Sequence, residues 1–356
     1  HAGGCGEGES CRSMSPKRRH RGGKSRASSG RHPHPHTVEE LQEQAFVCTQ
    51  NAHYEDAEKL FRMAIDMDPR NGDLLDALGQ VILELGRPQD ALEVFQRSAE
   101  VDPEGSFVKY LNLGQLSEGM DSITFYNKGC EILQRRIDTI ARDLNSSSFQ
   151  GNAEERLEEL RDQLASSLAA IAEVYMTDCC YEENAEQECE RALQVALEAA
   201  PSNVEVHQTM ASMRLSQCRE EDAADLLKKA LELMEPLDDT KKPAIPFRLA
   251  TAKLLMEVKH YEEACHLLDS LVEEDDQIGE TWYLRGLAYS LCGQEDKCVE
   301  FLAIAYEIMH DCEEDADLCE DIREKYPQSV EMAERAIEEA RRQQQEEEEN
   351  GEASRC

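Results

Sequence analysis

The chain has 356 residues, and its 38 Lys and Arg stand against 75 Asp and Glu, which gives a formal net charge of −37 at pH 7. So acidic a chain excludes nucleic acid as a default partner. No apolar run approaches the roughly 18 residues that a membrane span needs, so a membrane partner is not expected either. Aromatic residues make up only 5% of the chain, and no alternating apolar run indicates a strand. An all-α fold is therefore expected.

The N-terminal segment, residues 1–36, differs from the rest in charge and composition. It holds eight Lys or Arg against two Glu and is rich in Gly, Ser, Pro and His. Because it offers almost nothing to bury, this composition predicts a disordered basic arm. Its "PKRRHRGGK" stretch is interpreted either as a nuclear-localisation patch or as a solvated arm, and both interpretations stay open.

An internal repeat follows the arm. "YEDAEKLFRMAIDMDPRN" begins at Tyr54, and "PQDALEVFQRSAEVDPEG" begins at Pro88. The second stretch begins 34 positions after the first. Three residue types recur at the same spacing of 34 positions: Ala57 and Ala91, Phe61 and Phe95, and Pro69 and Pro103. This pattern is typical of tetratricopeptide repeats (TPRs), which have a period of about 34 residues. In such repeats, small residues let the paired helices approach, a large residue fills the space between them, and a proline ends the second helix. One helix pair cannot bury its apolar face alone, so such pairs form a stack.

The repeat continues with residues 209–233, 251–271 and 281–308, and two regions interrupt it. One is an insertion with long helices at 130–176, which contains a polar loop at 145–152. The other is a proline-rich joint at 235–246. The predicted fold is a right-handed superhelical TPR solenoid of six to seven helix pairs over residues 37–312. Capping helices are expected at 313–343, and an acidic disordered tail at 344–356.

No motif for catalysis stands out. The phosphate-binding loop, the nucleophile elbow and the H-E-x-x-H metal motif are all absent. The fourteen Cys form no C-x-x-C motif. Cys189, Cys265, Cys292 and Cys298 occupy positions in the predicted helices that suit buried thiols. The acidic runs at 273–276 and 346–349 lack an apolar pocket that would raise a carboxyl pKa. We therefore expect a protein that is not an enzyme, with no catalytic residues, no metal site and no cofactor.

Binding is the expected activity, because a TPR stack presents the first helix of each pair on a concave surface. The repeat positions place six candidate partner-binding residues there: Asp73, Asp76, Glu84, Glu205, Glu280 and Tyr283. Three further candidates, Glu118, Glu173 and Asp178, lie in the third and fourth helix pairs, where the repeat is irregular. Asp178 has an alternative role as the cap of the helix that follows it. An acidic groove favours a basic ligand. A groove for the acidic tails of heat-shock chaperones would need Lys, Arg and Asn, so that role is disfavoured.

The irregular third and fourth units resemble a known family. The resemblance lies in "KYLNLGQLSEG" (109–119), "YNKGCEIL" after it, and "LAAIAEVYMTDCCYEENAEQECERAL" (168–193). "DLLDALGQ" in the second unit and "ASMRLSQ" in the fifth add to it. These segments resemble the dedicated assembly chaperones for the fourth protein of the large ribosomal subunit, over residues 38 to 340. Cys179–Cys180 and the 145–152 loop are local departures from the family pattern.

The resemblance implies a chaperone that captures the newly made ribosomal protein and shields its long basic internal loop. It also implies delivery to nuclear pre-ribosomes, hence a location in cytoplasm and nucleus, with the nuclear import machinery as a further partner. The alternative is a TPR scaffold subunit of a stable multiprotein complex. The salt dependence of partner binding distinguishes the chaperone from the scaffold, because screening weakens a charged contact far more than an apolar one.

Overall fold

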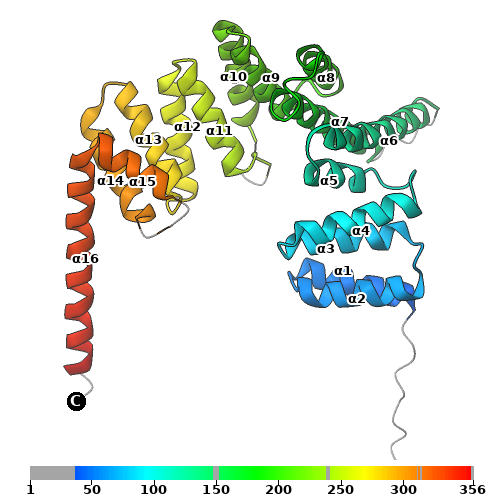
Figure 1. Ribbon diagram of the computed structural model, residues 1–356, viewed down its shortest axis with the longest axis horizontal. Coiled ribbons are helices and arrows are strands. Elements are labelled where there is room, and N and C mark those ends of the chain that lie inside the picture. Colours follow the sequence, from blue (N-terminus) through cyan, green and yellow to red (C-terminus); the bar gives the residue numbers. More distant parts are fainter. Residues whose placement is uncertain (1–36, 147–151, 238–240, 311, 313–314, 354–356) are drawn as a thin grey trace, which may run out of the picture.

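The computed structural model describes residues 37–146, 152–237, 241–310, 312 and 315–353. In this part of the chain there are sixteen helices and no strands, arranged as an arch (Figure 1). Fourteen of the helices form seven consecutive pairs. These are α1 (Val38–Gln50) with α2 (Tyr54–Met67), α3 (Gly72–Glu84) with α4 (Pro88–Val101), α5 (Val108–Leu116) with α6 (Gly119–Ser146), α7 (Ala153–Met176) with α8 (Ala185–Ala199), α9 (Val204–Ser216) with α10 (Glu220–Met234), α11 (Ile245–Glu257) with α12 (Tyr261–Glu274), and α13 (Gly279–Leu291) with α14 (Glu295–Met309).

A small residue on the first helix and a large residue on the second recur in these pairs. A Cβ added to Gly79 would lie 2.6 Å from the Phe95 ring, and one added to Gly286 would lie 2.7 Å from Leu302. In five pairs the two residues are buried and sixteen positions apart: Ala45 and Phe61, Gly79 and Phe95, Ala211 and Leu227, Ala252 and Leu268, and Gly286 and Leu302. The predicted all-α TPR solenoid is confirmed.

The third and fourth pairs depart from this spacing. Helix α5 has only nine residues, and Gly114 packs against Tyr126, twelve positions later, because the turn before α6 is short. Helices α6 and α7 have 28 and 24 residues, contact each other and extend beyond their neighbours (Figure 1). They run through the region predicted to hold long helices. Most of the predicted 145–152 loop lies outside the described residues.

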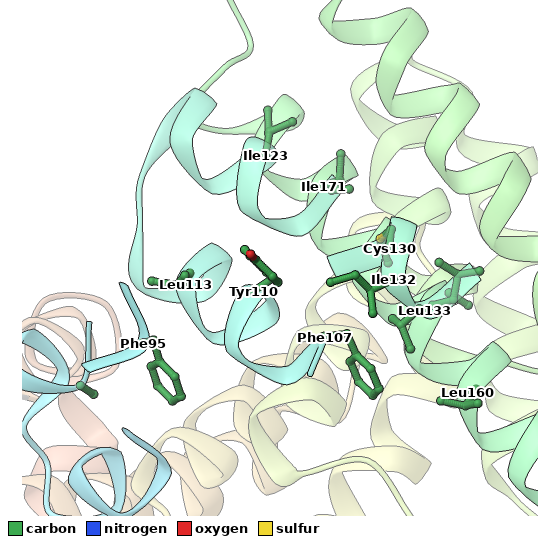
Figure 2. Close-up of a cluster of buried hydrophobic side chains, with 14 of the residues drawn as sticks. Phe95, Phe107, Tyr110, Leu113, Ile123, Cys130, Ile132, Leu133, Leu160 and Ile171 are labelled. Atoms are coloured by element: carbon green, nitrogen blue, oxygen red, sulfur yellow. The ribbon is translucent and has the colours of Figure 1, made fainter. Parts of the chain in front are cut away.

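The hydrophobic core divides into two clusters within α9, and the second cluster continues across the proline-rich joint. One continuous cluster of buried residues runs from Leu41 to Met213, and Figure 2 shows its passage through Phe95, Tyr110 and Leu160. A second cluster extends from Ala211 to Tyr289. Across the joint, α9 and α11 are held by a polar bridge as well. Its donor is the Gln208 amide, which gives hydrogen bonds to the Thr251 hydroxyl (2.9 Å) and the Phe247 carbonyl (3.1 Å).

Two further helices, α15 (Ala316–Lys325) and α16 (Pro327–Ala353), follow the seventh pair. Cys319, Ile322 and Ala333 are buried against α14, where capping helices were predicted. The predicted start of an unstructured tail at residue 344 needs correction, since α16 continues to Ala353. Its Gln- and Glu-rich sequence has few residues to bury, but both residue types are good helix formers. Residues 354–356 and the predicted basic arm at 1–36 lie outside the described residues. None of the described helices has the length and apolar character to cross a bilayer.

Candidate partner-binding groove

The first helices of the central pairs lie side by side on the inner side of the arch. Helix α7 contacts α9, α9 contacts α11, and α11 contacts α13. Helices α8 and α10 lie at the top of the arch in Figure 1, outside α7 and α9. The inner surface at the centre of the molecule is therefore built by α7 and α9.

An acidic path crosses this surface, and we define it by four carboxylates: Glu158, Asp162 and Glu173 of α7 and Glu205 of α9. Glu173 is exposed, and its Oε1 accepts a hydrogen bond from the Thr209 hydroxyl at 3.2 Å. Crowding by the surrounding helices raises the pKa of Glu173, and the negative charge of Glu205 raises it further. Within the part of the chain that the structure describes, no Lys or Arg forms an ion pair with any of the four. The path therefore carries negative charge without an internal counter-ion.

Asp162 and Glu158 are members of the path that the sequence prediction missed. Burial raises the pKa of Asp162, and although Asn203 lowers it by hydrogen bonding, Glu158 and Glu205 raise it further. A usable signal existed, because residues 158, 162 and 173 of one helix are separated by four and eleven positions and so share a face. The repeat pattern gave no such positions, since α7 is longer than a standard repeat helix.

The predicted groove residues of the second pair divide into two kinds. Asp73 and Glu84 are exposed on α3, as a groove position requires. Asp76 is only 7% exposed, so its predicted place on the groove surface is wrong. It accepts a hydrogen bond from Ser98 and lies 3.8 Å from the ammonium of Lys109, whose side chain is fully buried. Burial raises the pKa of Asp76 despite these partners.

Asp178 and Glu118 lie where the two family-like segments meet. The Asp178 carboxylate accepts a hydrogen bond from the backbone N–H of Gly119, the first residue of α6, at 3.2 Å. Asp178 therefore caps the helix of the preceding pair, and not the helix that follows it in sequence. Glu118 is exposed in the same turn. This contact joins segment 109–119 to segment 168–193, the two segments that carry the resemblance.

The two predicted residues of the seventh pair are engaged within the molecule. Glu280 forms a 2.6 Å ion pair with Lys253 of α11. The Tyr283 hydroxyl donates a hydrogen bond of 2.8 Å to Asp321 of α15, and burial is the main reason that its pKa is raised. Tyr283 therefore links α13 to the capping helix, and its role in partner binding stays a prediction. Of the nine predicted residues, Glu173 and Glu205 are the ones brought together at the centre.

Known proteins resemble the chain over most of its length. A probable assembly chaperone of rpl4 from Schizosaccharomyces pombe is 34% identical over 236 residues, which are 64% of this chain and 66% of the relative. One from Emericella nidulans is 32% identical over 273 residues, which are 71% of this chain and 65% of the relative. A solved structure of the assembly chaperone of RpL4 (Acl4, residues 1–338) superposes with a TM-score of 0.68 at 33% identity, over 74% of this chain and 99% of that one. The chain belongs to the family of RpL4 assembly chaperones.

The resemblance inferred from segments 109–119 and 168–193 is thereby confirmed. Members of the RpL4 assembly chaperone family are named as chaperones, a non-enzymatic kind of protein. This chain spans about two thirds of the length of the curated relatives that it matches, 66% and 65%. No protein-family model matches it.

Proposed function

We propose that this chain binds newly made ribosomal protein L4 and shields its long basic internal loop in the groove formed by α7 and α9. We further propose that it escorts the bound protein from the cytoplasm to nuclear pre-ribosomes. Membership of the RpL4 assembly chaperone family supports the choice of partner. The observation that carries the choice of surface is the acidic path, whose four carboxylates have no ion-pair partner within the described chain.

The chemistry of the path suits Arg and Lys side chains. Carboxylates accept two parallel hydrogen bonds from one guanidinium, so several such pairs along an extended segment add up to firm binding. Crowding already disfavours the charged form of Glu173 in the free protein. A bound cation would relieve this, because an opposite charge close by stabilises the carboxylate. The groove is thus better matched to a basic ligand than to water.

The test reverses two charges of the path and measures both binding and stability. Glu173→Lys combined with Glu205→Lys is expected to weaken L4 binding about tenfold or more. The reason is that one close charge pair contributes about 1.5 kcal/mol or more to the binding free energy. Glu173 lies in the last turn of α7 and Glu205 in the first turn of α9, so their helix-dipole effects oppose each other. The melting temperature should therefore change little. Asp178 is left unchanged because it caps α6.

A matched control carries the same change of charge on the outer side. Glu221→Lys with Asp225→Lys alters two exposed carboxylates of α10, neither of which forms an ion pair within the described residues. This control is expected to bind L4 within about twofold of the unchanged protein, because its charges lie on the far side of α9. Equal loss in both double variants would remove α7 and α9 from the proposed site. Normal binding by both would do the same.

A further inference from the structure

A partly apolar pocket lies at the N-terminal end of the inner surface, away from the acidic path. It has a volume of about 410 Å³ and is bordered by α1, α3 and α5, the first helices of the first three pairs, together with α2. Phe46 lies at the edge of the pocket, with 44% of its surface exposed. Its ring packs edge-on against the ring of the buried Phe61, and the two ring centroids are 5.4 Å apart. Ala77 and Val81 of α3 complete the apolar wall.

The rim of this pocket is polar and negatively charged. Glu84 and Gln80, both exposed on α3, line it, and Glu84 forms no ion pair within the described residues. An apolar hollow beside a free carboxylate matches a large apolar side chain that has a basic neighbour. The pocket borders the first helices of the first three pairs, and the acidic path lies on those of the fourth and fifth, so an extended segment that follows the first helices in order would contact both.

We infer that this pocket anchors one bulky apolar side chain of the basic segment that the groove binds. The inference rests on the proposed function for the identity of the segment, L4, but not for its chemistry. Charges along a groove attract a basic segment in many registers, since neighbouring Arg and Lys side chains can exchange places. A single apolar anchor fixes the register, because only one alignment fills the pocket. The pocket thus supplies specificity, and the acidic path supplies attraction.

The first experiment uses synthetic peptides, so that it does not depend on L4. Two Arg–Gly peptides of equal length and charge carry either one Phe or one Ala at the centre. The Phe peptide is expected to bind the full chain about fivefold to tenfold more tightly, because burying a large apolar side chain stabilises a complex. Equal affinity of the two peptides would overturn the inference.

Two variants locate the effect in the pocket. Phe46→Ser removes its aromatic edge, and Ala77→Leu fills it while leaving Phe46 and Phe61 in place. Both are expected to abolish the preference for the Phe peptide and to leave binding of the Ala peptide within about twofold. Val47→Ser is the matched control: Val47 is 52% exposed on the same helix and does not line the pocket. A preference that survives Ala77→Leu would place the apolar contact elsewhere and overturn the assignment.

The second experiment repeats the measurement with purified L4. Failure of the unchanged chain to bind L4 would contradict the proposed function, while the peptide results still decide the pocket. L4 binding that is normal in both Phe46→Ser and Ala77→Leu would overturn the pocket as an anchor for L4. We expect both variants to weaken L4 binding about fivefold or more, with the larger loss at high salt, where the charged contacts are screened.

Discussion

Carboxylates of the same chain have opposite roles according to their surroundings. Asp76 is enclosed between α3, α4 and α5 and shares its site with the buried Lys109, so it holds three helices together. Glu173 also has a raised pKa, because the surrounding helices crowd its carboxylate and Glu205 repels it, but within the described residues it forms no ion pair. Asp76 was selected from the sequence by its repeat position, and Glu173 by its place in the family-like segment 168–193. Only the location of Lys109, which belongs to the next helix pair, separates the structural carboxylate from the candidate binding one.

The Asp76–Lys109 pair gives a prediction at this scale. Lys109→Met should lower the free energy of unfolding by about 3 kcal/mol, because it leaves a buried carboxylate without its counter-charge. Lys109 also donates hydrogen bonds to the Ser98 hydroxyl and the Asp102 carbonyl, and these would be lost as well. Asp76→Asn combined with Lys109→Met removes the unpaired charge and should recover part of this loss. Urea unfolding of both variants measures the difference. Equal stability of the single and double variants would show that the charge pair contributes nothing.

At the scale of elements, both the regular helix pairs and the long helices α6 and α7 were predictable, whereas the contacts that join distant elements were not. The small and large residues at sixteen-residue spacing define a pair locally, so the sequence alone identifies it. Long helices were also predicted at 130–176, where α6 and α7 run, but their contact with each other is not encoded by any local pattern. Likewise, the cap of α6 comes from Asp178, which is distant from Gly119 in the sequence. The predicted end of α16 was too early because its low hydrophobicity indicates disorder, whereas its helix propensity stays high.

The turns within the pairs give a second prediction. Gly86 has a backbone φ of +70° in the turn after α3, and Ala52, at the equivalent position of the preceding pair, adopts φ +57° in the turn after α1. An L-residue in this left-handed region costs about 1–2 kcal/mol, whereas glycine adopts it freely. Ala52→Gly should therefore raise the free energy of unfolding by about 0.5–1 kcal/mol, since the gain is reduced by the greater backbone freedom of glycine in the unfolded chain. Gly86→Ala should lower it by a similar amount.

Thermal unfolding of these two variants checks the prediction. No atom lies within 4 Å of a Cβ added to Gly86, so Gly86→Ala would report backbone strain without a steric clash. A change of the same sign in both variants would mean that something other than the left-handed turn sets the preference.

At the scale of the whole molecule, the acidic character of the surface was predictable and its arrangement was not. A net charge of −37 already indicates a basic partner. Which carboxylates remain available depends on contacts between units: Lys253 engages Glu280 across α11 and α13, whereas nothing comparable engages Glu205 within the described residues. Such pairings join residues that are distant in sequence and lie on separate repeats. The sequence therefore predicted an acidic surface and two residues of the acidic path, Glu173 and Glu205. It did not predict Glu158 and Asp162.

The last prediction concerns how this charge acts on the partner. Electrostatic interactions reach about 10 Å at 0.1 M salt and about 3 Å at 1 M, so binding by the acidic path should weaken about tenfold or more over this range. An apolar contact of a stable scaffold complex would persist or strengthen. Affinity for purified L4, measured along a sodium chloride series, distinguishes the two. The Glu173→Lys, Glu205→Lys variant should give a shallower dependence than the unchanged chain, because fewer attractive charges remain to be screened. A flat series for the unchanged chain would contradict electrostatic capture and favour the scaffold alternative.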